Sequence, residues 1–137
     1  MNDFDNMVLL QITGDNVDFD AISTSLSLKP THCCRNGQPY PGLDGLVPPF
    51  TEDVWIYEPF PDNSKSIQES IDHLWTLLKP KKPYLLQLSK AYMYGIVIII
   101  KPLRLIGLHT LQPSSLDIFR ELNICLNIVI ANNKLQA

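Results

Sequence analysis

The residues whose types best suit chemistry are consecutive: His32, Cys33, Cys34 and Arg35. A histidine beside two thiols could bind zinc, or could pair a nucleophile with its base. Zinc sites usually separate their cysteines by a short spacer, whereas adjacent residues on a strand point to opposite faces of the sheet. We therefore expect one cysteine to be buried as a small apolar residue and the other to be an inert surface thiol.

The other groups that could bind a metal or transfer a proton are isolated or have a structural explanation. His73, His109 and Cys125 each stand alone in the sequence. The pair Asp18 and Asp20 suits the start of a helix, and Glu52 with Asp53 directly precedes a strand. We therefore expect no catalytic residue, no metal and no cofactor, and we interpret the protein as a non-enzyme.

Periodic apolar residues and turn signals predict the elements that must position these groups. Ser66 and Glu69 form a capping box before a helix with a broad apolar stripe, and Asp18 is the expected N-cap of an earlier helix that Pro30 ends. A third helix is expected to be capped at Ser114 or Ser115, with Leu116 facing inward. Strands are expected over residues 7–13, 53–58, 93–101 and 125–131, with a short strand or edge segment over 31–37. The segment 38–50, which contains four prolines, is expected to be a long loop.

This order of elements predicts an α+β fold. We expect a mainly antiparallel sheet of about five strands with helices packed on one face. The 137 residues fit a single domain, 1–137, with a core over 8–131. The start of the chain is acidic and the longest apolar run, YGIVIII, is far shorter than a membrane helix needs. We therefore expect a cytoplasmic protein that does not contact a membrane.

Helices on one face of a sheet leave the other face to be covered. If the alternate residues of the strands face the helices, the second face is apolar in three strands, and one of two pairs from the strand 53–58 joins it. The helix-facing set is Val8, Leu10, Ile12, Ile96, Ile98, Ile100, Leu126, Ile128 and Ile130. The second-face set is Leu9, Val97, Ile99, Cys125 and Val129, with either Trp55 and Tyr57 or Val54 and Ile56. Either the 38–50 loop or another chain could cover this face.

Charge is distributed unevenly along the chain. Residues 1–72 hold twelve acidic and three basic residues, net −9, whereas residues 73–137 hold eight basic and two acidic residues, net +6. The fold could bring the two halves together and neutralise them, or the acidic half could steer the protein toward a basic partner. The net charge of −3 and the lack of a basic stripe argue against nucleic acid as a partner.

Several of these motifs occur in an order that resembles a known family. The stretches ITGDNVDFDAISTSLSLKPTHCCRNG, VWIYE, SIQESIDHLWTLLKPKKPYLLQL and SLDIFRELNICLNIVI resemble the bacterial domain-of-unknown-function family 4279, over residues 8–131. Asn127 stands where the resemblance leads us to expect an aspartate. The resemblance implies an α+β fold and a bacterial cytoplasmic origin, and it implies no catalytic residue. Small acidic bacterial domains of this kind often resemble immunity proteins that bind a toxin.

We therefore expect a small bacterial protein-binding domain, an immunity protein that neutralises a cognate toxin by direct contact. Two alternatives remain: an enzyme or ligand-binding protein with a pocket under the 38–50 loop, using His32, Cys34 and Arg35, or a structural homodimer. The expected partner is another protein, with no nucleic acid and no membrane. The residues expected to contact the partner are Tyr40, Phe50, Glu52, Asp53, Trp55 and Tyr57.

Overall fold

The computed structural model describes residues 4–39, 49–61, 65–102 and 111–130. The strands in this part are β1 (Phe4–Gly14), β2 (His32–Cys34), β3 (Asp53–Tyr57), β4 (Met93–Pro102) and β5 (Cys125–Ile130). The α-helices are α1 (Phe19–Leu26), α2 (Ile67–Leu78), α3 (Lys82–Leu88) and α4 (Asp117–Leu122). Two short 3₁₀ helices, η1 (Lys79–Lys81) and η2 (Pro113–Leu116), complete the described elements. None of the helices in these ranges is both long and apolar enough to cross a membrane.

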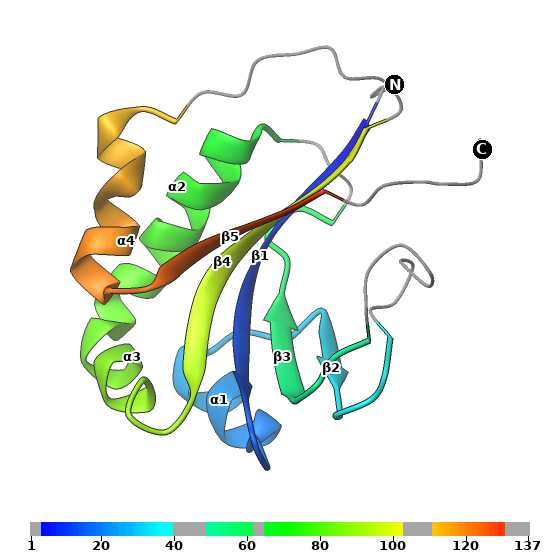
Figure 1. The fold of residues 1–137 in the computed structure, drawn as a ribbon. Coiled ribbons are helices and arrows are strands. Elements are labelled where there is room, and N and C mark those ends of the chain that lie inside the picture. The colour runs from blue at the N-terminus through cyan, green and yellow to red at the C-terminus, as the bar shows by residue number, and fades with distance from the viewer. Residues whose placement is uncertain (1–3, 40–48, 62–64, 103–110, 131–137) are drawn as a thin grey trace, which may run out of the picture.

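The strands form one sheet with the order β2-β3-β1-β4-β5 (Figure 1). Strand β1 pairs antiparallel with both β3 and β4, and β2 pairs antiparallel with β3. Only β4 and β5 run parallel, because the connection between them passes through η2 and α4 instead of a hairpin. The predicted α+β fold with a mainly antiparallel five-stranded sheet is confirmed.

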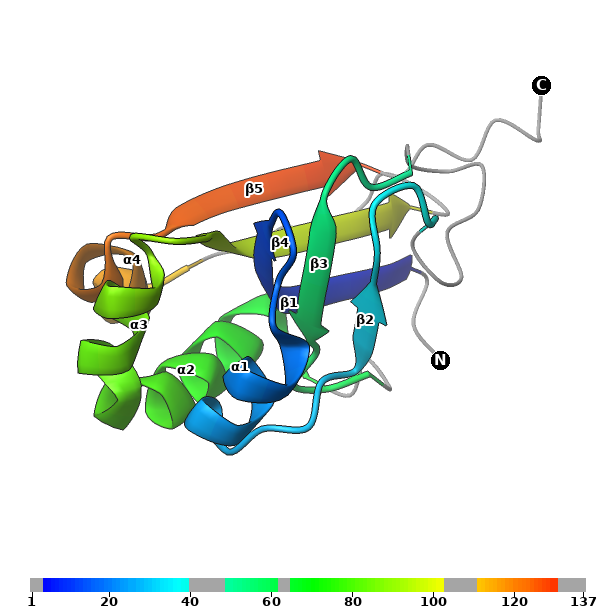
Figure 2. The same cartoon turned by 90° about the horizontal axis from the view of Figure 1, so that it is seen from below.

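All four helices pack on the same face of the sheet (Figure 2). Each contributes fully or nearly fully buried apolar residues to one core with alternate residues of the strands, which confirms the predicted one-sided packing. The helices supply Ile22, Leu26, Ile67, Ile71, Leu74, Leu78, Leu85, Leu88, Ile118 and Leu122. The strands supply Val8, Leu10, Ile12, Trp55, Tyr94, Ile96 and Ile98.

The predicted helix starts are confirmed where a side chain provides the cap. The Asp18 carboxylate accepts a hydrogen bond of 3.1 Å from the Ala21 amide, and Ser66 and Glu69 make both hydrogen bonds of the capping box. These bonds satisfy amides that the first helical turn leaves without a partner.

Two predictions about helix ends were wrong. Helix α1 ends at Leu26, before Pro30, because Ser27 adopts a left-handed conformation with φ of 56° and donates back into the helix. Helix α4 begins at Asp117 after the 3₁₀ helix η2 and has no side-chain cap from Ser114 or Ser115. Leu116, expected to face inward, is 44% exposed, since it belongs to η2, where the helical period changes.

The second face of the sheet carries its own apolar cluster. Its members are Leu9, Val54, Ile56, Val97 and Ile99, all buried, with Met7, Phe50 and Val129 packed against them. Of the two pairs that the sequence left open, Val54 and Ile56 therefore join this face, and Trp55 faces the helices. Phe50, near the start of β3, supplies part of the cover of this cluster, whereas Cys125 of the same expected face is exposed. Residues 40–48 lie outside the described part.

Gly14, the last residue of β1, is required by the aromatic ring that lies against it. A Cβ atom at this position would come within 2.7 Å of the Tyr92 ring. The Tyr92 hydroxyl in turn accepts a hydrogen bond of 3.3 Å from the Asp18 amide, so the ring joins the start of α1 to the segment before β4. Close approach at Gly14 thus couples two segments that are distant in sequence.

We expect Gly14→Ala to lower the free energy of unfolding by about 1–3 kcal/mol, because the new methyl group overlaps the Tyr92 ring. Urea denaturation measures this change. In a Tyr92→Ala background the same substitution should cost much less, because the overlap is gone. Equal costs in the two backgrounds would show that the ring is not the reason for glycine.

Candidate functional site

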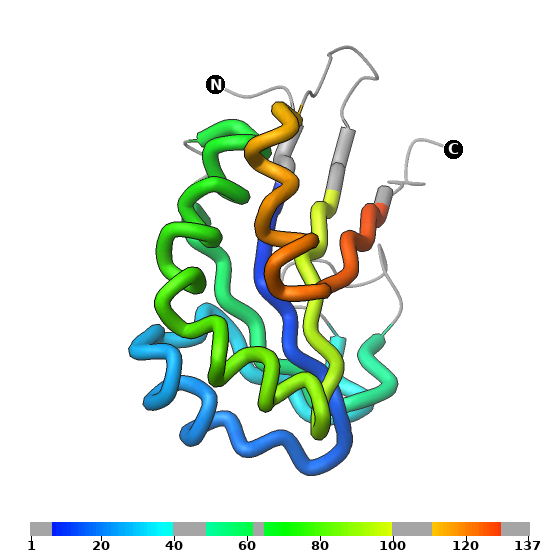
Figure 3. Tube along the Cα trace, turned by 90° about the vertical axis from the view of Figure 1, so that its left-hand side faces the viewer, coloured from blue at the N-terminus to red at the C-terminus, as the bar shows by residue number. Residues whose placement is uncertain are grey.

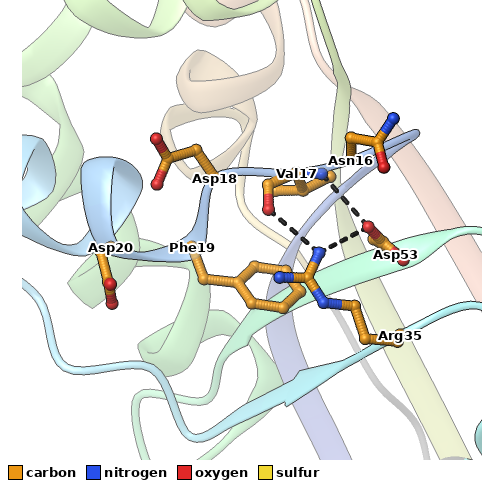
Figure 4. Close-up of a pocket in the computed structure, with 7 residues that line it drawn as sticks. All are labelled: Asn16, Val17, Asp18, Phe19, Asp20, Arg35 and Asp53. Atoms are coloured by element: carbon orange, nitrogen blue, oxygen red, sulfur yellow. Dashed lines mark hydrogen bonds and ion pairs between the residues drawn. The ribbon is translucent and has the colours of Figure 1, made fainter.

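An open hollow of about 620 Å³ lies at the start of α1 (Figure 4). We call it the α1 hollow. It is formed where the turn after β1, the first residues of α1, the residue after β2 and the first residue of β3 meet. Its lining residues are Asn16, Val17, Asp18, Phe19, Asp20, Arg35 and Asp53.

Asp53 is the buried centre of the hydrogen bonds around this hollow. Its Oδ2 atom accepts from Nη1 of Arg35 at 2.6 Å and from the Val17 amide at 3.2 Å, and its Oδ1 atom accepts from the Asn36 amide at 3.1 Å. The Asn36 amide and the other donors hold the pKa of the Asp53 carboxyl below its usual range, against an opposing effect of desolvation. Asp53 therefore stays ionised, and its hydrogen bonds join the start of β3 to the turn before α1 and to the residues after β2.

Arg35 is fixed in place but still exposed. Its Nη1 atom also donates to the Val17 carbonyl at 3.2 Å, and its guanidinium carbon lies 4.1 Å from the centroid of the Phe19 ring. The side chain is 57% exposed, so its other N–H groups face the hollow and the solvent. A ligand that reaches the hollow meets a guanidinium whose position is already set.

The pairing of β2 with β3 explains why these two residues meet. Cys34 lies opposite Val54 in this antiparallel pair, which places Arg35 opposite Asp53 one step further along. The base of the 38–50 loop continues the same contact, since Gly37 donates to the Phe50 carbonyl and Phe50 donates to the Gln38 carbonyl. The sequence alone does not reveal this ion pair, because the register across a long connection cannot be derived from a turn motif.

Exposed carboxylates lie on the turn and the helix that help to form the α1 hollow. Asp15, Asp18 and Asp20 are all exposed on the turn after β1 and on the first turn of α1. Arg35 is the only basic side chain among the residues that line the hollow, and Asp53 already neutralises it. The rim is therefore suited to attract a cationic group, while Arg35 and the backbone offer donors and acceptors within.

A smaller hollow of about 120 Å³ lies on the second face of the sheet. Gln11, Thr13, Gly95 and Asn127 line it together with the exposed Cys125. Gly95 has no side chain that could fill this space, and an added Cβ atom would come within 3.1 Å of the Cys125 carbonyl oxygen. It contains polar groups but no charged side chain, in contrast to the α1 hollow.

The structure does not bring the six expected contact residues to one surface. Asp53 is buried in the hydrogen bonds just described, and Glu52 precedes it in a partly buried position. Trp55 is fully buried in the helix-side core, where it donates to the Ser23 hydroxyl, and the half-buried Tyr57 stacks on it with centroids 6.5 Å apart. Phe50 packs on the opposite face of the sheet. Tyr40 lies outside the described residues.

The two adjacent cysteines take the opposite positions that the sequence predicts for neighbouring strand residues. Cys34 is buried and Cys33 is exposed. Desolvation raises the pKa of both thiols, and for Cys33 it outweighs the lowering effect of Arg35. A raised pKa keeps both thiols protonated near neutral pH and makes them poor nucleophiles. In the described ranges, no three or more His, Cys, Asp and Glu residues converge as a metal site would require.

We expect Asp53→Asn to lower the melting temperature at neutral pH by several degrees, since it removes the charge that holds Arg35. Because the pKa of Asp53 is lowered in the folded state, its ionised carboxylate stabilises the fold at pH values above the unfolded-state pKa of about 3.9. This stabilisation is lost as the pH falls through the folded-state pKa. The difference between wild type and variant should therefore shrink below about pH 4. Thermal unfolding recorded across this range measures it.

Asp72→Asn is the matched control, because Asp72 is exposed on α2. It should leave the melting temperature almost unchanged at neutral pH. If the Asp53→Asn deficit stayed constant down to the lowest pH, the ionised carboxylate would not be its cause.

Comparison with known proteins identifies a family. The family model described as "Domain of unknown function (DUF4279)" matches residues 4–133, nearly the whole chain. No curated protein and no solved structure matches the chain.

Proposed function

The chain belongs to the DUF4279 family, and we propose that this member is a bacterial, cytoplasmic protein-binding domain that neutralises a toxin by masking it. The observation that supports this best is the α1 hollow, whose lining includes the exposed carboxylates of Asp18 and Asp20 and an arginine held in position by Asp53. Its geometry suits recognition of a protein surface more than chemistry on a substrate.

The charge pattern supports a basic partner. The ion pair Arg35–Asp53 joins two residues of the acidic half, whereas Lys82–Glu121 and Arg120–Asp117 join residues of the basic half. Among the described residues these pairs do not neutralise one half with the other, so the acidic residues around α1 keep their negative potential. Such a potential increases the rate at which a positively charged partner arrives in the correct orientation.

Arg35 supplies the fixed anchor of the proposed interface. Its guanidinium is held by the Asp53 carboxylate, by the Val17 carbonyl and by the face of the Phe19 ring. A side chain that is already ordered loses little conformational entropy when a partner binds. Arginine and aromatic residues are also the types that contribute most to binding energy at protein interfaces.

The toxin as partner rests on analogy with small acidic immunity proteins, and the acidic hollow gives that analogy a physical basis. A toxin that acts on a polyanion such as a nucleic acid or a membrane presents a basic surface. A domain with clustered carboxylates can cover that surface and block access.

Co-expression tests the proposal directly. The protein encoded next to this chain should arrest bacterial growth when it is expressed alone, and expression of this chain should restore growth. The purified pair should form a stable complex. Growth arrest that this chain does not relieve, or a pair that does not associate, would contradict the proposal.

We expect the double variant Asp18→Asn and Asp20→Asn to slow association with that partner about tenfold at low salt, because it removes two carboxylates from the rim. Asparagine still caps α1, so the fold should be retained. Stopped-flow association at several salt concentrations measures the rate and its salt dependence.

The control makes the same change of charge on helix α2. Glu69→Gln with Asp72→Asn also removes two negative charges, and glutamine can keep the capping box with Ser66. This pair should change the association rate by no more than about twofold. If both double variants slowed association equally, total charge and not the α1 hollow would determine the rate.

A further inference from the structure

The two edges of the sheet differ in how well they are protected from pairing with another strand. The β2 edge is only three residues long and is bracketed by Lys29, Pro30 and Arg35. Strand β5, at the other edge, has six residues, CLNIVI, without a proline or a charged residue. Short strands, prolines and charges are the usual means of preventing edge-to-edge association, and β5 uses none of them.

The outer strand also presents apolar side chains. Leu126 and Ile128 lie beside Ile96 and Ile98 of β4 in the parallel register, so they point to the helix side of the sheet. They lie on the expected side of the sheet, but they are 38% and 61% exposed. The reason can be followed in Figure 3. Helices α2 and α4 lie over other strands of the sheet, and no described helix lies over β5 itself.

We propose that β5 pairs antiparallel with β5 of a second copy, so that the two sheets join into one of ten strands related by a two-fold axis. An antiparallel arrangement is the one that a two-fold axis perpendicular to the sheet imposes on two identical edges. No described strand pairs with the outer edge of β5, so its backbone groups then gain hydrogen-bond partners, as in other strand additions.

A second copy fits this edge better than a charged partner. The strand carries no formal charge, so two identical edges can approach without repulsion. The charged residues of the adjoining α4 are already paired, Arg120 with Asp117 and Glu121 with Lys82. Strand β5 itself is thus uncharged, and the exposed Leu126 and Ile128 of one copy lie beside those of the other in the joined sheet.

This pairing leaves the α1 hollow accessible. The hollow is formed by residues at the β2 and β3 side of the sheet, and β5 is the opposite edge. A dimer would therefore present two hollows, and its formation does not depend on whether the proposed toxin partner exists.

Sedimentation velocity on the full chain tests the proposal. At about 100 μM even a dimer of micromolar affinity is nearly complete, so wild type should sediment as twice the 15.5 kDa chain. Ile128→Lys should weaken the dimer at least about tenfold, because it brings a positive charge from each copy to the joined edge. Amides of β5 should also lose protection from hydrogen exchange on dilution.

Met93→Lys is the matched control, since Met93 is 67% exposed and is the first residue of β4, before Gly95, which pairs with the first residue of β5. It adds the same charge and should leave the dimer intact. Circular dichroism and thermal unfolding confirm that both variants fold. A wild-type monomer at about 100 μM, or a dimer that Ile128→Lys does not weaken, would overturn the proposal.

Discussion

Strand β1 is buried on both faces of the sheet, and the rest of the fold depends on this burial. Val8, Leu10 and Ile12 face the helices, and Leu9 faces the second cluster. A strand without access to water must pair its backbone groups on both edges, and β1 does so with β3 and β4. The side-chain period of two then determines which residues of β3 and β4 reach each core, because a slip of one residue would reverse both faces.

The pairing of β1 with β3 also positions Asp53, the carboxylate that accepts the hydrogen bonds around the α1 hollow. Gly14 at the end of β1 lies opposite Asp53 at the start of β3, so the Asp53 carboxylate is next to the turn that leads into α1. From there it accepts hydrogen bonds from Val17 and Asn36 and forms the ion pair with Arg35. A carboxylate with this many donors is both a structural anchor and the element that orders the one arginine of the hollow.

The two surfaces with the clearest capacity for interaction lie at opposite edges of the sheet and differ in character. The α1 hollow is polar and acidic, and its geometry is fixed by hydrogen bonds. The edge at β5 carries no charged residue and exposes Leu126 and Ile128, and no described strand pairs with its outer side. Charge suits rapid encounter with a different molecule, whereas an uncharged, self-complementary edge suits another copy of the same chain.

The features that the sequence alone determined are those with a local cause. The caps at Asp18 and Ser66, the apolar stripe of α2 and the alternation along β1 depend on residues within a few positions of each other, so spacing was enough to predict them. The opposite positions of Cys33 and Cys34 follow from the same two-residue period. The fold class followed because these elements have few ways to bury their apolar faces.

Only the tertiary structure decided which distant residues meet. The parallel position of β5, its uncovered apolar side chains and the ion pair of Arg35 with Asp53 depend on strand order and register. Register is encoded in a short turn but not across a loop such as 38–50, where each side chain could find several partners. The burial of Trp55 beneath α1, and with it the position of the exposed surface, was therefore settled by packing between segments and not by local sequence.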